Sequence, residues 1–449
     1  MTIGIGLLGL GTVGAGVAEI LANPEGRHPL VAELALRRVA VRDLARPRAV
    51  PVAAELLTTQ AEAVVDDPAV DIVVEVLGGL EPARSLILRA IAAGKPVVTA
   101  NKAVIARHGE EIAAAAAAAG VYVLLEAAVG GGIPIIEPLK QSLGANRIDR
   151  VSGIINGTTN YILSRMAAEG ADYGAVLADA QRLGYAEADP AADVQGADAA
   201  DKIAILTGLA YGGSVPRQAI PTEGIDRLDA RDVAYADKLG YVVKLLAVAQ
   251  RIDSQPGGGD KASGDPDAVL LDVRVHPTLL PRSHPLAGVN GVFNAILVEG
   301  DPVGQVMFYG PGAGAGPTAS AVVADILNIA GIRQATLPAG SAGGPVGLDP
   351  LLAAGSWRRC RLIDGALTTH RNYVRLRTSD EAGVIGRIGT CFGEAGVSIQ
   401  SIVQFEAHSD AAEIVVITHE VLEERFRQAL DAIAALAEVQ GVAACLRTL

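Results

Sequence analysis

"GIGLLGLGTVGAGV", residues 4–17, places the glycines Gly9, Gly11 and Gly14 between an apolar run and a stretch with helical spacing. Such a pattern alone is a weak signal in a chain with 52 glycines, and the alternative is a flexible, apolar start of a helix. In a strand–turn–helix unit, the three glycines permit a tight turn, close approach of a phosphate, and close packing of helix on strand. The candidate phosphate-binding residues are Gly9, Leu10, Gly11, Thr12, Val13 and Gly14.

The segments downstream alternate between predicted strands and predicted helices. The strands are "LALRRVAVRD" (34–43), "DIVVEVLGG" (71–79), "KPVVTANKAV" (95–104) and "VYVLLEAAVG" (121–130). This alternation indicates an α/β fold with a parallel, doubly wound sheet, which favours a dinucleotide-binding turn over a merely flexible helix start. We therefore expect a Rossmann domain over residues 1–132, completed by residues from about 310 to 338.

The end of the second predicted strand carries two charged residues, Arg42 and Asp43. An acidic side chain here accepts hydrogen bonds from a ribose 2'-hydroxyl, whereas an arginine accommodates a 2'-phosphate. Both are present, so the sequence leaves NAD and NADP open as cofactors. A solvated pair of charges is the alternative interpretation.

Two further residues are expected near the cofactor. Lys102 follows a strand in "TANKAV", at the edge where open parallel sheets bind ligands, although a surface lysine at a helix start is the alternative. Gly314 lies in the glycine-rich stretch 309–330, which is predicted to run into a helix that folds back against the first domain.

Past residue 133 the strands follow one another without long helices, which predicts an antiparallel or mixed sheet and a second, substrate-binding and dimerisation domain over 133–309. Within it, 254–267 is predicted to be a polar surface insertion.

The segment "GYAEADPAADVQGADAADKIAILTGLAYG" (184–212) is the candidate centre of the chemistry. Asp198 and Lys202 are four residues apart on one helix face. Such a pair is usually a solvated salt bridge, but in apolar surroundings it becomes a proton donor with a carboxylate to position it. Glu187 and Asp193 precede the helix and could bind a substrate ammonium group, with a solvated acidic loop as the alternative.

The last quarter of the chain is predicted to be a separate domain. After a connector over 339–370, residues 371–449 show the order strand, helix, strand, strand, helix, strand, with the turn "TSDEAGVIG" (378–386) before the first helix. We expect a ferredoxin-like domain that resembles an ACT module, and a plain interaction domain is the alternative. The three cysteines, Cys360, Cys391 and Cys445, have no metal-ligand or disulfide spacing.

Composition excludes several classes of partner. A net charge of −13 and 3% aromatic residues argue against nucleic acid. No apolar run reaches the length of a membrane span, and the amino terminus lacks a targeting pattern. We expect a cytoplasmic protein with no membrane partner.

Several long motifs, taken together and in order, resemble homoserine dehydrogenase over residues 1 to about 340. They are "GLLGLGTVG", "TANKA", "EAAVGGGIPI", "GIINGTTNYIL", "LGYAEADPAADVQGADAADKIAIL" and "GPGAGAGPTA". The resemblance implies reversible reduction of L-aspartate 4-semialdehyde to L-homoserine with NADPH or NADH, in threonine, methionine and isoleucine biosynthesis. No kinase-like segment precedes these motifs, so the monofunctional form is expected.

The resemblance also implies residue roles. Lys202 corresponds to the proton donor, with Lys102 as a second active-site lysine and Asp198 in support. Glu187 corresponds to the residue that binds the substrate's amino group, with Asp193 as a supporting acid and Thr158 where substrate and cofactor meet. A monovalent cation, usually sodium, would be held by Glu126 and the main-chain carbonyls of three residues, Val129, Gly131 and Ile133.

The ACT resemblance implies an amino-acid effector, for which threonine is the candidate, and paired domains imply a homodimer or homotetramer. Two other functions are weaker. Aspartate-semialdehyde dehydrogenase requires a cysteine nucleophile, and the first 359 residues contain no cysteine. An amino-acid sensor with a degenerate cofactor domain would be favoured by the loss of Lys102, Lys202 or Glu187, and all three are present.

Overall fold

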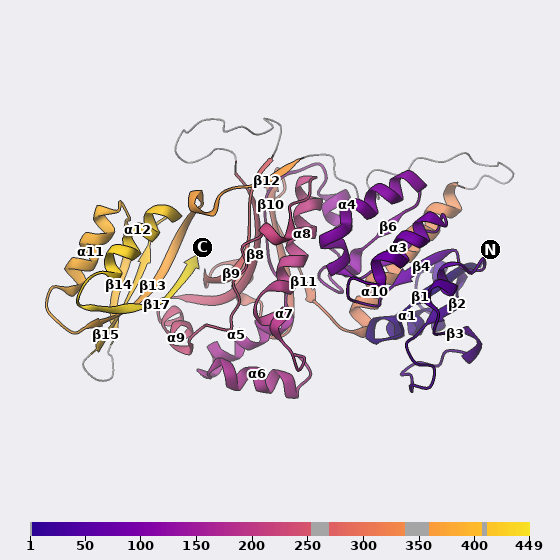
Figure 1. Cartoon of the computed structure of the whole chain (residues 1–449), viewed down its shortest axis with the longest axis horizontal. Helices are drawn as coiled ribbons and strands as arrows, with labels where there is room; N and C mark the ends of the chain where they lie inside the picture. Colours follow the sequence, from indigo (N-terminus) through magenta and orange to yellow (C-terminus); the bar gives the residue numbers. More distant parts are fainter. Residues whose placement is uncertain (1, 253–268, 337–358, 406–410) are drawn as a thin grey trace. The chain divides into compact units, whose positions relative to one another are not determined.

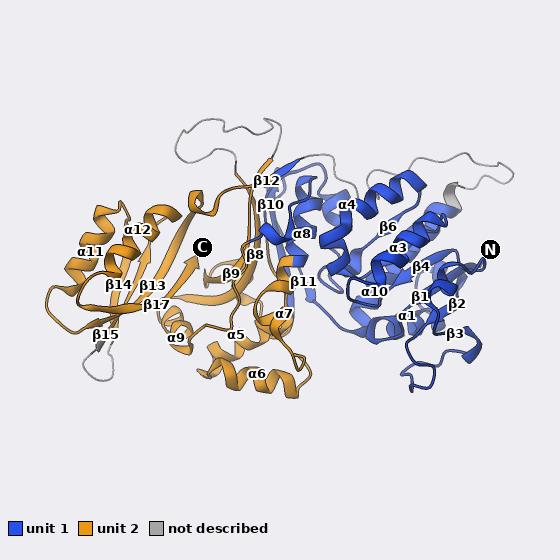
Figure 2. Cartoon of the chain, viewed as in Figure 1, with its two compact units in different colours: residues 1–151, 201–220, 293–360 blue, residues 152–200, 221–292, 361–449 orange. Residues whose placement is uncertain are grey.

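The computed structural model describes residues 2–252, 269–336, 359–405 and 411–449. The chain divides into two compact units (Figure 2). Unit 1 contains residues 1–151, 201–220 and 293–360, and unit 2 contains residues 152–200, 221–292 and 361–449. The predicted insertion at 254–267 and most of the connector lie outside the described residues.

Unit 1 is built on a six-stranded parallel sheet in the order β3-β2-β1-β4-β5-β6 (Figure 1). The strands are β1 Ile3–Leu8, β2 Leu34–Ala40, β3 Leu57–Thr58, β4 Ile72–Glu75, β5 Val97–Thr99 and β6 Val123–Leu124. The helices are α1 Thr12–Ala22, α2 Ala61–Val65, α3 Ala83–Ala92, α4 Lys102–Ala119 and α10 Ala315–Thr336. The strand order reverses direction between β1 and β4, which is the switch point where such sheets bind dinucleotides.

The glycine-rich turn between β1 and α1 has the backbone that its spacing predicts. Gly9 has φ of +106°, a conformation that side chains disfavour. A Cβ atom on Gly14 would lie 2.2 Å from the Gly9 carbonyl oxygen, so only glycine lets α1 approach the turn this closely. The turn therefore depends on both residues for its geometry.

Helix α10 belongs to the core of unit 1, although it is far from β1 in sequence. By length and composition alone, its residues Ala315–Arg333 could cross a membrane, contrary to the expectation that no run is long enough. Half of that window is buried within the protein. Val322, Ile326 and Ile329 pack in one cluster with the buried side chains of β1. Packing in the core of unit 1 therefore explains why α10 is apolar.

The rest of unit 1 includes an antiparallel hairpin of β10 Phe293–Asp301 and β11 Gly304–Pro311. Within the described residues, three elements cross the division between the units, namely β7 Arg147–Ile154, α8 Ala197–Tyr211 and the short strand β12 Cys360–Leu362.

Unit 2 contains the strands β8-β9-β17-β13-β15-β14 in this order. Their bounds are β8 Tyr241–Arg251, β9 Val269–Pro281, β13 Thr369–Ser379, β14 Ile399–Phe405, β15 Ala411–Thr418 and β17 Val439–Thr448, with short strands β12 Cys360–Leu362 and β16 Val421–Leu422 beside them. The helices are α5 Gly157–Glu169, α6 Tyr173–Arg182, α7 Ala191–Val194, α9 Ala230–Lys238, α11 Val384–Glu394 and α12 Glu423–Ala434.

Residues from 369 onward have the predicted order of strands and helices, with sheet order β17-β13-β15-β14. On one face, Val374 and Leu376 pack with Phe392 of α11 and Phe426 of α12. Parallel pairing of β17 with β9 joins this sheet to β8 and β9, so the carboxyl-terminal module is integrated into unit 2. The fold class predicted from the sequence is confirmed: an α/β Rossmann domain, a mixed-sheet domain and a ferredoxin-like module.

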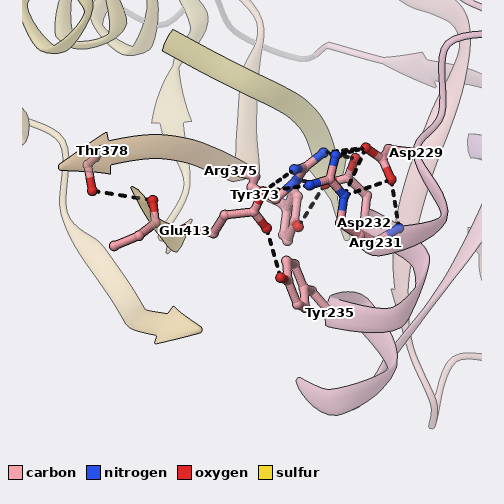
Figure 3. Close-up of polar contacts among 9 residues, drawn as sticks. Asp229, Arg231, Asp232, Tyr235, Tyr373, Arg375, Thr378 and Glu413 are labelled. Carbon is pink, nitrogen blue, oxygen red and sulfur yellow. Dashed lines mark hydrogen bonds and ion pairs between the residues drawn. The ribbon is translucent and has the colours of Figure 1, made fainter. Parts of the chain in front are cut away.

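The other face of the carboxyl-terminal sheet packs on α9 through buried charges (Figure 3). Arg375 on β13 is 1% exposed and bonds both carboxylate oxygens of Asp232, at 2.7 and 3.0 Å. It also donates to Glu413 on β15 at 2.9 Å, and the Tyr373 hydroxyl donates to Asp232 at 3.0 Å. Burial alone would lower the pKa of Arg375, but its carboxylate partners raise it, so the guanidinium stays charged.

Candidate active site

The turn at residues 9–14 fits the pyrophosphate of a dinucleotide. Helix α1 begins at Thr12, and Gly11 occupies the capping position before it without a side chain that could cap the helix. The amides of the first helical turn have no acceptor within the helix, which leaves them available to a phosphate. A Cβ atom at Gly11 would meet nothing within 4 Å, which leaves open space against the backbone. Gly314 lies directly before α10 in the same unit and is exposed.

The charged pair Arg42 and Asp43, which is predicted to bear on the choice between NAD and NADP, lies just beyond β2, because that strand ends at Ala40. Asp43 forms a local turn in which its Oδ1 accepts from the Ala45 amide at 2.8 Å. Arg42 is exposed beside it. One carboxylate oxygen of Asp43 thus accepts a hydrogen bond from the backbone of its own turn, and the Arg42 guanidinium faces solvent.

Lys102 is the first residue of α4, at the carboxyl edge of the parallel sheet, as predicted. The helix is capped by Asn101, whose Oδ1 accepts from the Val104 amide at 3.3 Å. The Asn101 amide also donates to the Gly79 carbonyl at 2.8 Å. Lys102 is half-buried, so it is held by a structured helix start and is more than a mobile surface lysine.

In unit 2, two of the predicted acids converge on Asn156, the cap of α5. Its Nδ2 donates to Asp193 at 2.7 Å and to Asp198 at 2.9 Å. The Thr158 hydroxyl donates to the Tyr185 carbonyl at 2.6 Å and lies 3.3 Å from Asp193. The structure therefore brings Asp193 and Asp198 together around one amide, with Thr158 beside Asp193.

Helix α8 carries both Asp198 and Lys202, and each is 8% exposed. This burial rejects the alternative of a solvated surface pair. Because Asp198 is held by Asn156, Lys202 follows one helical turn after a fixed carboxylate.

Glu187 differs from the other predicted acids because its side chain is exposed, in the loop between α6 and α7. The amide of Gln181 donates to the Glu187 carbonyl at 3.1 Å, which holds the loop by its backbone. The carboxylate itself is left on the surface of unit 2.

Glu126 is 4% exposed and begins a buried segment that includes Val129, Gly131 and Ile133. Its carboxylate accepts from three successive amides, those of residues 135 and 136 at 2.6 and 2.9 Å and that of residue 137 at 2.8 Å. One carboxylate with neutral carbonyls matches the charge and the hard oxygen donors that a monovalent cation prefers. The amide donors alone also account for a buried charge, so the set is compatible with a cation without requiring one.

Sequence reasoning missed two residues that organise the site. The sequence identifies Asn156 only as a candidate cap of helix α5, and nothing in its spacing indicates that it contacts two acids 37 and 42 residues away. Asp325 of α10 accepts from the Glu126 amide at 2.8 Å, while its other oxygen is buried with no hydrogen-bond partner. Burial raises the pKa of Asp325 well above its usual range.

Comparison with known proteins identifies the family. Residues 9–126 match the model for the homoserine dehydrogenase NAD-binding domain, residues 134–327 match that for homoserine dehydrogenase, and residues 372–438 match the ACT domain. The homoserine dehydrogenase of Synechocystis sp. is 56% identical over the whole of both chains. This chain belongs to the homoserine dehydrogenase family.

Solved homoserine dehydrogenases have the same fold. The enzyme from Thiobacillus denitrificans superposes with a TM-score of 0.86 at 42% identity, covering 100% of this chain and 98% of that one. A hyperthermophilic archaeal homoserine dehydrogenase in complex with NADPH has a TM-score of 0.59 at 27% identity, covering 75% of this chain and 99% of that one.

Membership of the family establishes the activity. The chain is an NAD(P)-dependent oxidoreductase that acts on a CH–OH group and interconverts L-homoserine and L-aspartate 4-semialdehyde. The predicted family, reaction and ACT domain are confirmed.

Proposed function

We propose that Lys202 is the proton donor of this homoserine dehydrogenase, with Asp198 positioning it and Lys102 as the second active-site lysine. The observation that carries this proposal is the buried helix α8, on which Lys202 follows one turn after an Asp198 carboxylate held by Asn156. A fixed carboxylate favours the charged form of a neighbouring lysine and restricts its orientation. An ammonium group can act as the general acid that protonates the oxygen when a carbonyl is reduced.

The residues act on the charge that forms during the reaction. When bound, the nicotinamide dinucleotide supplies the hydride, or accepts it in the reverse direction. Negative charge then builds on the substrate oxygen, where the Lys202 ammonium stabilises it and transfers a proton from Nζ. We assign Glu187 to the substrate's ammonium group, supported by Asp193, and Thr158 to the border between substrate and cofactor.

The test replaces Lys202 by methionine, which keeps length and removes charge. We expect Lys202→Met to retain cofactor binding, and kcat for homoserine oxidation to fall on the order of 10²- to 10⁴-fold, the range for a lost acid–base group. Lys238→Met, at an exposed lysine of α9, is the matched control and should stay near wild type. Wild-type turnover in Lys202→Met would reject the assignment.

We propose NADP as a cofactor that this enzyme accepts, with NAD as the alternative. The turn at Gly9–Gly14 would hold the pyrophosphate, Arg42 the 2'-phosphate, and Gly314 would lie close to the bound nucleotide. The support is that Arg42 and Asp43 are both exposed, and that one oxygen of Asp43 is already engaged by the Ala45 amide. Wild-type kcat/KM for NADP should exceed that for NAD, and Arg42→Ala should reduce the preference. A preference for NAD in the wild type would contradict this.

We also propose a sodium ion bound by the Glu126 carboxylate and the carbonyls of Val129, Gly131 and Ile133. We propose a homodimer as the smallest assembly, with a homotetramer as the alternative. Finally, we propose threonine as the effector of the ACT domain. For threonine, the support is the turn before α11, where Gly383 has φ of +90° and the helix starts with no side-chain cap. Free amides at a helix start suit the carboxylate of an amino acid.

A further inference from the structure

Glu75, the last residue of β4, is a charged side chain with no exposure at all. The strand lies in the middle of the parallel sheet, where Glu75 is paired with Leu8 of β1 and Thr99 of β5. Burial raises the pKa of Glu75. Burying a carboxyl group costs free energy unless hydrogen bonds replace those lost to water, so we expect Glu75 to have compensating contacts.

The contacts of Glu75 come from the two segments that follow β4 and β5. Its Oε1 accepts from the Leu77 amide at 2.8 Å, and its Oε2 accepts from the Thr99 hydroxyl at 2.7 Å. The Asn101 amide reaches Oε1 at 3.5 Å. One carboxylate thus binds both segments at the edge of the sheet where the dinucleotide binds.

These two segments are also joined to each other by Asn101, whose backbone bonds within its own segment and whose side chain reaches the segment after β4. The Asn101 backbone amide donates to the Thr99 hydroxyl oxygen at 3.0 Å, and its side-chain amide donates to the Gly79 carbonyl at 2.8 Å. Gly78 and Gly79 both have positive φ, 76° and 75°, so the turn that presents this carbonyl is a specific conformation. Asn101 is in turn the cap of the helix that begins with Lys102.

We propose that Glu75 is a positioning residue for Lys102. Its carboxylate fixes the Thr99 hydroxyl and the Asn101 amide, and through them the first turn of α4 and the turn at Gly78–Gly79. Glu75 acts through these groups and does not contact substrate. The inference rests on the proposed active-site role of Lys102, and the experiment separates the two.

The principal variant is Glu75→Gln, which keeps size but replaces one acceptor oxygen by a donor. We expect kcat to fall about 10- to 100-fold, the effect of misplacing a catalytic group by about 1 Å, while KM for cofactor changes less than threefold. Asp71→Asn is the matched control, since Asp71 precedes the same strand at its other end and accepts from the Gly4 amide at 2.7 Å. It should lower the melting temperature and leave kcat within twofold.

A double-mutant cycle with Lys102→Met decides whether the effect travels through that lysine. If Glu75 positions Lys102, then adding Glu75→Gln to Lys102→Met should cost less than twofold, because the positioned group is already gone. If the losses of kcat in the two single variants multiply in the double variant, or if Glu75→Gln keeps wild-type kcat, the inference about Glu75 is overturned while the role of Lys102 stands. Wild-type kcat in Lys102→Met would instead overturn the role of the lysine, and the inference with it.

A second pair of variants covers the case in which Glu75→Gln does not fold. Thr99→Val removes only the hydroxyl that joins Glu75 to the Asn101 amide, and Thr99→Ser restores it. We expect Thr99→Val to lower kcat by about tenfold and Thr99→Ser to return to within twofold of wild type. Equal kcat in the two variants would overturn the proposal, whatever the behaviour of Glu75→Gln.

Discussion

Glu126 shows how one buried side chain can serve two roles. Three consecutive amides donate to its carboxylate, which fixes the backbone after Pro134 and stabilises the charge. The proposed sodium ion would use remaining lone pairs of the same carboxylate. Beside this segment, Asp325 accepts from the Glu126 amide with one oxygen, and its other oxygen is buried with no hydrogen-bond partner.

The sodium proposal predicts an ion-specific stabilisation. Replacing sodium chloride by choline chloride at constant ionic strength should lower the wild-type melting temperature, since a ligand that binds only the folded state contributes about 2.7 kcal/mol at one hundred times its Kd. Glu126→Gln should abolish the difference between the salts, whereas the nearby Glu137→Gln should keep it. Equal wild-type melting temperatures in the two salts would rule the site out.

Strand β11 is an element with an unusual surface. It lies at the end of its sheet, paired only with β10 in the strand order, and two of its exposed side chains, Met307 and Tyr309, are large and apolar, beside the polar Gln305. Met307 is 42% exposed and Tyr309 is 54% exposed, with the Tyr309 ring stacked on Phe293 at 5.2 Å. An exposed apolar edge is a hazard for a monomer and a suitable interface for a second copy of the chain.

This surface predicts where the proposed homodimer would form. Tyr309→Lys should shift the mass measured by light scattering or sedimentation from dimer towards monomer, because a buried aromatic side chain at an interface typically contributes 2 kcal/mol or more. Leu44→Lys, at a similarly exposed residue outside the strand, is the control and should leave the mass unchanged. An unchanged mass in both Tyr309→Lys and Met307→Lys would place the interface elsewhere.

Across the whole molecule, the ACT module is joined to the catalytic sequence by the cluster around Arg375. Asp232 lies on α9, and α9 packs on α5, the helix whose cap Asn156 holds Asp193 and Asp198. A change in the ACT sheet can therefore reach the proposed substrate residues through two packed helices. The cluster also makes removal of the ACT module a poor test, because truncation would take away both the β17 strand that pairs with β9 and the Arg375 partner of Asp232.

Arg375→Met tests this connection while the chain stays complete. Arg231 still donates to Glu413, but Asp232 loses its guanidinium, which should reduce the free energy of unfolding by about 3–5 kcal/mol and weaken inhibition by threonine, with basal turnover retained. Arg427→Met, which removes a surface ion pair with Glu423 on α12, should cost at most about 1 kcal/mol and leave the response intact. A folded Arg375→Met enzyme with wild-type threonine inhibition would show that the cluster is only structural.

Features encoded by neighbouring residues along the chain could be predicted from the sequence. The glycine turn, the alternation of strands and helices, Lys102 at a helix start and the spacing of Asp198 and Lys202 were all predictable, because backbone geometry and helical periodicity are local. Even there, strand ends shifted by a few residues, as at β2, because pairing with neighbours decides where a strand stops.

Tertiary structure alone decided which distant polar groups meet. Asn156 contacts acids 37 and 42 residues away, Glu75 accepts from Thr99 on the adjacent strand, and Arg375 is 143 residues from Asp232. No local periodicity encodes these pairs. They form because strand order and helix packing bring chain-distant polar groups into buried sites, where each must find a partner to offset the loss of water.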